Sequence, residues 1–471
     1  MIMVYHSFLK QEGLFLAVLQ HDLTQGDPRR HILLFALPLI QAMIFQAMYN
    51  AVDLFFAGQY LGLAGQAAVS VCGPVMNVLL RTVNGMSIGV SILVGRRVGM
   101  GDDEYTRRGA NTAITLYAVG AIALTLLGIL FTPLILQMVQ TPAEAMAGAT
   151  SYLRIVFSGS VFTMGYSLIN AFQRGFGDSR SSLYFVMVST LVNIVLDWFF
   201  LSFTQLEAAG LALATVAAQA VSFLLGVAYF RKNGHLVDFR LSSLLFHKGD
   251  AKDLLSLGLP TAFQQLLLTA AQLTLAGIAN SFGLAATAAY GIGLRIDAFA
   301  ALPATAVGDA VSAFASQNFG VGNEKRAVEG RKQGNLLAVG MGCIIAVAVL
   351  LFAPQLARIF NKDAEVLALA VPYLRWITPL YPLLAAVQAP VGFVRGSGNT
   401  LFPVLQTLLV QYVIRLPLAF FFAYTLNLQL IGVALAWSVA PAVSVCIYTF
   451  SLRSGLWRKA CRKAETTADH T

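Results

Sequence analysis

The sequence predicts an all-α polytopic membrane protein, with twelve transmembrane helices in two parallel six-helix lobes around a central cleft. Three observations lead to this fold class: the composition, the spacing of the apolar segments and an internal repeat. Hydrophobic residues make up 57% of the 471 residues and charged residues only 11%, with a mean hydropathy of +0.72. Soluble domains carry about 25% charged residues, so this composition is typical of a chain that crosses a membrane many times.

The apolar segments have the length of membrane-spanning helices, which need about 20 mostly apolar residues. We expect twelve of them, centred near residues 45, 82, 122, 162, 193, 220, 267, 303, 344, 381, 413 and 441. Glycine, proline and charged residues separate them. The connections are mostly short, as expected for packed antiparallel helices.

Lysine and arginine predict the orientation. With the N-terminus inside, most of the 31 basic residues fall in loops on one side of the membrane, which the positive-inside rule assigns to the cytoplasm. We therefore expect a multi-pass protein of the cell inner membrane with both termini cytoplasmic. These loops account for the net charge of +9, so it gives no reason to expect a nucleic-acid partner.

An internal repeat relates the two halves at an offset of 221 residues. VSILVGRRVGMGDDEYTRRG, starting at Val90, resembles VSAFASQNFGVGNEKRAVEG, starting at Val311. At the same offset QRGFGDS resembles VRGSGNT, which pairs Arg174 with Arg395. Because each repeat holds six spans, an even number, the halves are parallel and related by an axis along the membrane normal. Two such lobes with a cleft between them are typical of transporters.

The repeat also predicts the domain boundaries. They are a cytoplasmic N-terminal segment (1–30), a first lobe (31–230), a cytoplasmic inter-lobe loop (231–252), a second lobe (253–453) and a cytoplasmic tail (454–471). We expect the DFRLSSLLF portion of the loop to form a short amphipathic helix at the membrane interface.

The sequence gives no sign of an enzyme. It has no Walker A pattern, and no Ser/His/Asp or metal-ligand cluster lies at a membrane boundary. Its four cysteines are scattered and form neither a disulfide framework nor a metal-binding spacing. We therefore expect no cofactor, and transport that is driven by an ion gradient.

Acidic residues inside the first lobe are the main candidate site. MYNAVDLFFAG places Asp53 in an apolar run, about five residues or roughly 7 Å below the outer end of the first span. The fifth span carries Asp197 at a similar depth and Asn193 one turn earlier on the same face. The sixth span places Thr215 at a matching depth. An intramembrane Asp costs about 2.5–3.5 kcal/mol on insertion scales, which favours a functional role over a buried acid that is merely hydrogen-bonded to a neighbouring helix.

Two chemistries fit these four side chains. Carboxylate, amide and hydroxyl oxygens are hard ligands suited to Na⁺, whereas two close acids in a low dielectric would share a proton. The repeat offers a comparison, because at the 221-residue offset Asp53 falls on Thr274 and Asp197 on Leu418. The acids are therefore present in one lobe only, which suits a site better than a scaffold.

Several motifs resemble the multidrug and toxic compound extrusion (MATE) transporters. They are LPLIQAMIFQAMYNAVDLFFAGQYLG, NIVLD in the fifth span, GLALAT in the sixth, and the paired RGFGDSR and RGSGNT loops. The resemblance covers nearly the whole chain from about residue 22. DLTQGDP and the pattern of acids resemble the DinF-like branch most.

This resemblance implies export of organic, often cationic compounds in exchange for Na⁺ or H⁺. It implies a coupling-ion site at Asp53, Asn193, Asp197 and Thr215, a surrounding polar network of Gln46, Tyr49 and Asn170, and a bend of the first span at Pro38. Proline inside a helix removes a backbone hydrogen bond; a fixed kink and a moving hinge both remain open.

The second lobe departs from the NorM-like branch, which carries acids in the seventh and tenth spans. The seventh span has Gln264 and Gln265 instead, and the tenth has no acid between Tyr373 and Arg395. We therefore expect ion coupling to depend on the first lobe.

The eighth span keeps charges of its own. Arg295 and Asp297 are two residues apart and so project in different directions, and Asp309 lies about three turns deeper. We favour structural ion pairs with other helices, and keep a gating or substrate role as the alternative for Arg295 and Asp297. Arg81 and Arg415 are assigned to structural or interfacial roles.

The sequence thus predicts a secondary active multidrug efflux antiporter that works by alternating access. Its expected partners are small organic substrates and the lipid bilayer, and we expect a monomer. Two alternatives remain. A lipid-linked saccharide flippase of the same superfamily would be expected to have a large cationic groove, and a non-transporting membrane scaffold gives no reason for acids to converge in one lobe.

Overall fold

The computed structural model describes residues 22–232, 236–237, 239–240, 243–455 and 457–458. Throughout these ranges the chain forms helices joined mostly by short connections, and no strand. The helices are α3 (Pro28–Tyr60), α4 (Leu63–Met100), α5 (Asp103–Met138), α6 (Ala143–Ser158), α7 (Ser160–Gly175), α8 (Ser179–Phe203), α9 (Glu207–Lys232), α10 (Lys248–Asn280), α11 (Leu284–Gly320), α12 (Glu324–Phe360), α13 (Ala364–Ile377), η3 (Thr378–Leu380), α14 (Tyr381–Gly396), α15 (Leu401–Thr407), η4 (Leu408–Arg415), α16 (Leu416–Phe420), η5 (Phe421–Thr425) and α17 (Gln429–Ser454).

These helices account for the twelve predicted spans. Within the described ranges eleven helical segments are long and apolar enough to cross a membrane, with α13 to α14 counted as one segment and α15 to η5 as another. The twelfth span is the pair α6 and α7, which bend by 50° at Gly159. Every predicted centre falls inside one of these segments, so the predicted fold class is confirmed.

The turns after the first two helices of each half show why the repeat keeps its glycines. Gly101 ends α4 with φ +72° and Gly322 follows α11 with φ +70°, the left-handed conformation that glycine adopts without steric cost. The next side chain then caps the following helix. Asp102 accepts a hydrogen bond from the backbone N–H of Tyr105 (2.9 Å), and Asn323 accepts one from Arg326 (3.1 Å).

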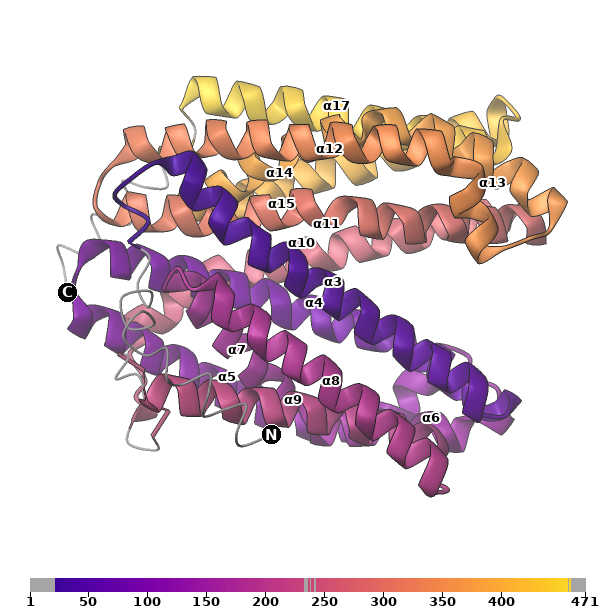
Figure 1. Cartoon of the computed structure of the whole chain (residues 1–471), viewed down its shortest axis with the longest axis horizontal. Helices are drawn as coiled ribbons and strands as arrows, with labels where there is room; N and C mark the ends of the chain where they lie inside the picture. Colours follow the sequence, from indigo (N-terminus) through magenta and orange to yellow (C-terminus); the bar gives the residue numbers. More distant parts are fainter. Residues whose placement is uncertain (1–21, 233–235, 238, 241–242, 456, 459–471) are drawn as a thin grey trace.

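Figure 1 shows the two halves, α3 to α9 and α10 to α17, lying together at one end and diverging toward the other. We call the end at which they meet the basic end, because the α4–α5 and α11–α12 turns bring arginine and lysine there. Its residues include Arg96, Arg97, Arg107, Arg108, Lys325 and Arg326. The opposite end contains the α3–α4, α8–α9, α10–α11 and α12–α13 connections.

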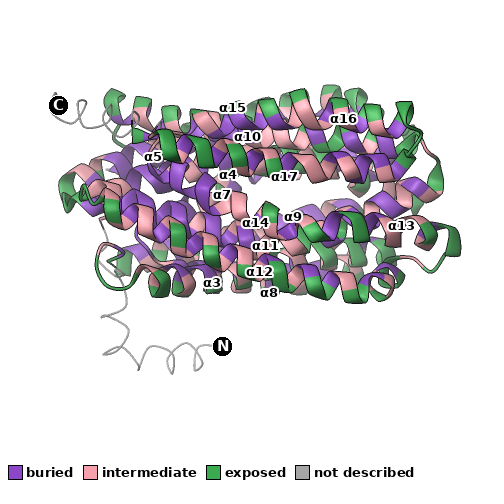
Figure 2. Cartoon of the chain, turned by 90° about the horizontal axis from the view of Figure 1, so that it is seen from above, coloured by how far each residue is buried: buried purple, intermediate pink, exposed green. Residues whose placement is uncertain are grey.

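The outward faces of the helices are exposed although they are apolar. Leu126 and Leu130 of α5, and Ile344 and Leu351 of α12, are all more than half exposed. Figure 2 shows exposed residues along the outer helices and buried residues between them. Exposed apolar surface of this extent marks contact with membrane, so these faces meet lipid.

Backbone contacts between glycines hold the two halves together at the basic end. A Cβ atom added to Gly89 of α4 would lie 2.6 Å from the Cα of Gly258 in α10, and one added to Gly99 would lie 2.1 Å from the carbonyl oxygen of Gln317 in α11. Small residues permit this approach, as in other membrane helix pairs. Both glycines lie in the half of α4 nearer the basic end, which is where the two halves of the molecule touch.

The segment before α3 also crosses between the halves. The backbone N–H of Leu23 donates to the side-chain oxygen of Gln317 (3.2 Å), and its carbonyl oxygen accepts from Asn318 (3.1 Å). Arg326 of α12 donates to the carbonyl oxygens of Leu23 (3.1 Å) and Gly26 (2.6 Å). The start of the first half is therefore attached to the second half.

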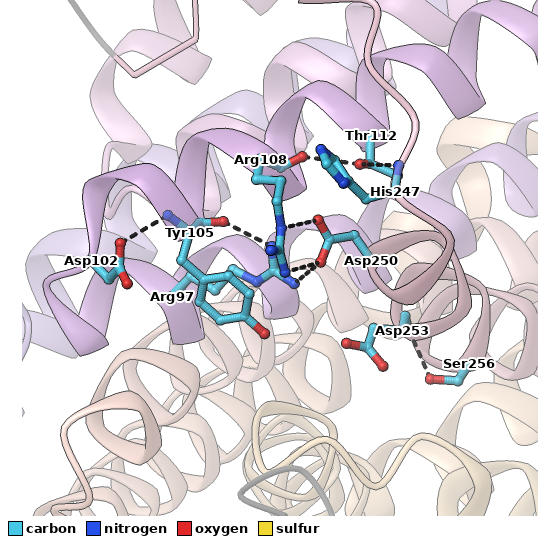
Figure 3. Close-up of polar contacts among 9 residues, drawn as sticks. All are labelled: Arg97, Asp102, Tyr105, Arg108, Thr112, His247, Asp250, Asp253 and Ser256. Carbon is cyan, nitrogen blue, oxygen red and sulfur yellow. Dashed lines mark hydrogen bonds and ion pairs between the residues drawn. The ribbon is translucent and has the colours of Figure 1, made fainter. Parts of the chain in front are cut away.

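An ion-pair cluster joins α4, α5 and α10 at the basic end (Figure 3). Asp250 accepts hydrogen bonds from Arg97 Nη2 (2.7 Å) and from Arg108 Nε (3.0 Å), and the guanidinium of Arg97 lies over the ring of Tyr105 at 3.7 Å. Asp250 belongs to the first turn of α10, where its negative charge also interacts favourably with the positive end of the helix dipole.

The predicted inter-lobe loop is shorter in the structure, because α9 continues to Lys232 and α10 begins at Lys248. The predicted amphipathic segment DFRLSSLLF includes Asp238, Leu241 and Ser242, which lie outside the described residues. Most of the predicted N-terminal segment and cytoplasmic tail also lies outside them, and the domain boundaries stay predictions.

Candidate functional site

The acids of the first half meet where α3 packs along α8. The amide nitrogen of Asn193, in the orientation that satisfies both carboxylates, donates to Asp53 Oδ1 (2.9 Å) and to Asp197 Oδ2 (3.2 Å). The two carboxyl groups also lie within hydrogen-bonding reach of each other. Asn193 and Asp197 are fully buried and Asp53 is partly buried. Three of the four predicted coupling residues therefore touch.

Helical spacing explains why these side chains share one place. Asn193 and Asp197 are four residues apart on α8, which puts them on one face one turn apart. On α3, Tyr49 and Asp53 are likewise four apart, and Gln46 lies seven residues before Asp53 and thus close to the same face. The facing sides of two helices supply the pair of acids.

Unpartnered oxygen atoms surround the pair. Thr215 of α9 and Tyr49 are buried, and neither hydroxyl forms a hydrogen bond of good geometry within the described residues; the same holds for Asp197 Oδ1. The Tyr49 hydroxyl lies within interaction range of both Thr215 and Asp53. Buried polar atoms are nearly always satisfied, so several unpartnered oxygens beside two acids indicate a place that can accept a proton or a small cation.

Asn170 lies elsewhere in the first half. Its side-chain oxygen accepts from Ser182 (2.6 Å) and its nitrogen donates to the carbonyl oxygen of Tyr166 (3.0 Å). Ser182 is 15 residues before Asp197 on α8, about 22 Å along the helix. The structure therefore does not bring Asn170 into contact with the acid pair.

Gln46 and Pro38 are the remaining first-half candidates. Gln46 is exposed on the face of α3 that carries Asp53. Pro38 lies inside α3, which continues as one helix from Pro28 to Tyr60, and it is 15 residues or about 22 Å from Asp53.

The charged residues of α11 do not form the ion pairs favoured from the sequence. Arg295 is exposed and its guanidinium lies 5.6 Å from the ring centre of Phe360, whereas Asp297 accepts a hydrogen bond of 2.5 Å from the Tyr381 hydroxyl. Within the described residues neither has a salt-bridge partner. Asp309 lies in electrostatic range of Arg174 and Arg395.

Sequence reasoning did not find a half-open cavity of about 160 Å³ in the second half. Helices α10, α14, α15, η4 and α17 line it, and its polar side chains include Arg395, Arg415 and four glutamines. The signal available in the sequence was Arg415, near the middle of the eleventh span, which the sequence analysis assigns to a structural or interfacial role. Sequence reasoning also missed Asp250, which lies within the predicted inter-lobe loop (231–252), whereas the structure places it in the first turn of α10.

Comparison with known protein families identifies the architecture. A family model described as MatE matches residues 38–199 and 260–421. The chain belongs to the MatE family. The two matched segments fall one in each half, so the repeat seen in the sequence coincides with the unit that defines the family. Its members are transporters and not enzymes, in agreement with the prediction.

Curated relatives cover almost the full chain. The chain is 28% identical over 438 residues to a probable multidrug resistance protein, YpnP, of Bacillus subtilis, covering 93% of this chain and 98% of that protein. It is 26% identical to the probable multidrug resistance protein NorM of Thermotoga maritima, covering 92% and 93%. The multidrug export protein MepA of Staphylococcus aureus is 24% identical over 88% of this chain and 90% of its own.

Solved structures share the fold. An outward-facing multidrug resistance MATE transporter matches with a TM-score of 0.86 and 23% identity, covering 93% of this chain and 98% of that chain. A transporter of the same superfamily from Pyrococcus furiosus matches with a TM-score of 0.85 and 23% identity, covering 92% and 97%. At this level of identity the likeness concerns the fold alone. The DinF-like branch stays a prediction.

Proposed function

We propose that the chain is a multidrug efflux antiporter, exporting amphiphilic organic compounds in exchange for H⁺ or Na⁺. The observation that most supports ion coupling is that the amide nitrogen of Asn193 donates hydrogen bonds to both Asp53 and Asp197. Export of drug-like compounds is supported by the family and by its multidrug resistance and multidrug export relatives.

Ion binding at the acid pair changes both charge and hydrogen bonding. A proton shared between the two carboxyl groups removes their repulsion, whereas Na⁺ takes oxygen ligands from the carboxylates and from Thr215. Either event alters how α3 packs against α8, since Asp53 and Asp197 come from these two helices. The ion drives transport because its affinity differs between the two conformations.

The arrangement of the halves fits an outward-open state of an alternating-access cycle. By the positive-inside rule the basic end is cytoplasmic, and the glycine contacts of α4 with α10 and α11 close that end. An ion from outside binds the acid pair, α3 rearranges and the substrate is released to the outside. The halves then open toward the cytoplasm, where a new substrate molecule binds. The protein acts in the inner membrane with both termini cytoplasmic.

Ethidium movement in proteoliposomes tests this proposal. Purified wild type and Asp53→Asn are compared under an imposed Na⁺ gradient and, separately, an imposed pH gradient. We expect one gradient to drive transport by the wild type and Asp53→Asn to abolish that response, because the pair then carries only one titratable carboxyl group.

The matched control is Glu365→Gln, which removes a carboxylate from the exposed first turn of α13. It should transport as the wild type does. Ethidium movement that ignores both gradients, or that survives Asp53→Asn at the wild-type rate, contradicts the proposed coupling site.

A further inference from the structure

The cavity in the second half differs in charge from the acid site of the first half. Among the described residues no acidic side chain lines its volume of about 160 Å³, whereas two arginines do: Arg395 at the end of α14 and Arg415 at the end of η4. Both guanidinium groups are partly buried, and the Nε atom of each has no hydrogen-bond partner within the described residues.

Neighbouring glutamines hold both arginines in place. Arg395 Nη2 donates to Gln264 Oε1 (2.8 Å), and the amide nitrogen of Gln264 donates to Thr407 Oγ1 (2.9 Å). Arg415 Nη1 donates to Gln411 Oε1 (3.0 Å). Each guanidinium is thus oriented by one of its ends, while further N–H groups stay available to a ligand.

A change in helix geometry directs Arg415 toward the cavity. Residues 408–415 form a π-helix, which is wider than an α-helix and is often found at functional sites. Thr407, Gln411 and Arg415, four residues apart, all line the cavity. Arg415 bonds to Gln411, four residues earlier, and Thr407, four residues earlier again, bonds to the glutamine that also holds Arg395.

We propose that this cavity binds the carboxylate of an anionic or zwitterionic aromatic compound during transport. Guanidinium groups pair with carboxylates through parallel N–H···O bonds, and the ring of Trp437 beside Arg415 supplies an aromatic wall for the attached ring. A cavity of similar size, about 150 Å³, holds a benzene ring in another protein, so this half-open cavity has room for a benzoate-like group, and a larger ligand would extend out of it.

Nearby acids favour a singly charged ligand. Asp297 lies in electrostatic range of Arg415, and Asp309 in range of Arg395, although neither acid lines the cavity or forms an ion pair with these arginines. They reduce the local positive charge without an ion pair to either guanidinium within the described residues. A carboxylate is therefore better matched than a phosphate dianion.

This inference rests on the proposed function for the direction of transport, but binding is measured without any ion gradient. The probe is 4-fluorobenzoate, with 4-fluorobenzamide as its neutral counterpart, and ¹⁹F NMR follows the binding of each to the purified full-length protein in detergent. We expect the benzoate to bind and the benzamide to bind about tenfold more weakly, because the amide loses the charge-assisted bonds.

Substitutions then assign the binding to the cavity. Arg415→Gln should weaken benzoate binding about tenfold, and Arg415→Lys, which keeps the charge but not the planar fork, should weaken it less. Arg358→Gln, which removes an exposed arginine of the same half, should leave it unchanged. Thermal melting and gel filtration establish that each variant is folded.

The inference would be overturned by equal binding of benzoate and benzamide, by no benzoate binding to the folded wild type, or by undiminished binding to folded Arg415→Gln. Competition by phenyl phosphate that is stronger than competition by unlabelled benzoate would also overturn it, since the ligand would then be a phosphate. The proposed ion site is tested by gradient-driven ethidium transport of Asp53→Asn and this cavity by gradient-free benzoate binding of Arg415→Gln, so failure of one and failure of the other are separately visible.

Discussion

The guanidinium of Arg97 and the carboxylate of Asp250 form a buried ion pair, with Nη2 2.7 Å from Oδ1. Arg97 lies near the end of α4 and Asp250 at the start of α10, so the pair joins the two halves at the basic end. Arg108 of α5 adds a second bond to the same carboxylate. The side chains of Arg97 and Asp250 are only 3% and 2% exposed, so each charge depends on the other for compensation.

Asp250→Asn should destabilise the protein more than an ordinary surface substitution. It leaves the buried guanidinium of Arg97 without a counter-charge, and removal of one partner from a buried pair typically costs about 3–5 kcal/mol. The measurement is the melting temperature of the purified protein in detergent.

Glu104→Gln is the control for this prediction. It breaks the exposed ion pair with Arg107, whose side chains are 76% and 56% exposed, and such pairs contribute about 0.5 kcal/mol or less. Equal melting temperatures for Asp250→Asn and Glu104→Gln would show that the buried pair does not stabilise the closed basic end.

Gly99→Ala should open the basic end. The new Cβ would lie 2.1 Å from the backbone carbonyl oxygen of Gln317, and backbone atoms cannot move away as a flexible side chain does. We expect the distance between spin labels at Asp103 and Lys325, both exposed at this end, to increase when measured by pulsed electron paramagnetic resonance in a cysteine-free background.

Gly73→Ala on the same helix is its control, because nothing lies within 4 Å of a Cβ atom at that position. The label distance should then match that of the parent protein. A Gly99→Ala distribution identical to the parent would mean that the α4–α11 contact is not needed to close this end.

Thr215→Val separates the two candidate coupling ions. A shared proton needs only the two carboxyl groups, whereas Na⁺ would lose the hydroxyl ligand whose oxygen is buried and unpartnered. If Na⁺ is the coupling ion, we expect the Na⁺ concentration for half-maximal ethidium transport to rise about tenfold. If H⁺ is the coupling ion, we expect transport driven by a pH gradient to stay unchanged.

Thr274→Val, which removes the exposed hydroxyl at the repeat position equivalent to Asp53, should change neither response. If the wild type is driven by a pH gradient and Thr215→Val reduces that transport, the hydroxyl contributes to the packing of α9 and not to ion binding.

Asp53→Asn and Asp197→Asn should not be additive. The two carboxyl groups and Asn193 form one hydrogen-bonded unit, and removing a second member of a unit costs little once the first is lost. Gradient-driven transport by the double variant should therefore equal that of the more damaged single variant. Losses that multiply would show that the two acids act at separate steps.

Composition and periodicity were enough to predict the spans. The apolar segments are long, and the helix-breaking turns that separate them, such as Gly101–Asp102 and Gly322–Asn323, are local features that need no partner. The convergence of Asp53, Asn193 and Asp197 was also predictable, because the depth of a residue in a spanning helix follows from its distance to the end. The contact itself depended on α3 packing against α8.

Other relationships joined residues that sequence spacing does not connect. Asp250 is 153 residues from Arg97 and looked like one more charge in a basic loop. Asn170 shares the first half with the acid pair, yet bonds to Ser182. Arg415 looked structural until the π-helix and the neighbouring helices placed it on a cavity.

The sequence by itself determined the membrane class, the twelve spans, the two-fold repeat and the depth of the acids, because these depend on local hydrophobicity and helix geometry. Only the tertiary structure decided which charges meet, which end of the molecule is closed and where the second half is hollow. Those features depend on the rotation of each helix about its axis and on its choice of neighbours, which are determined by side-chain packing across the whole bundle.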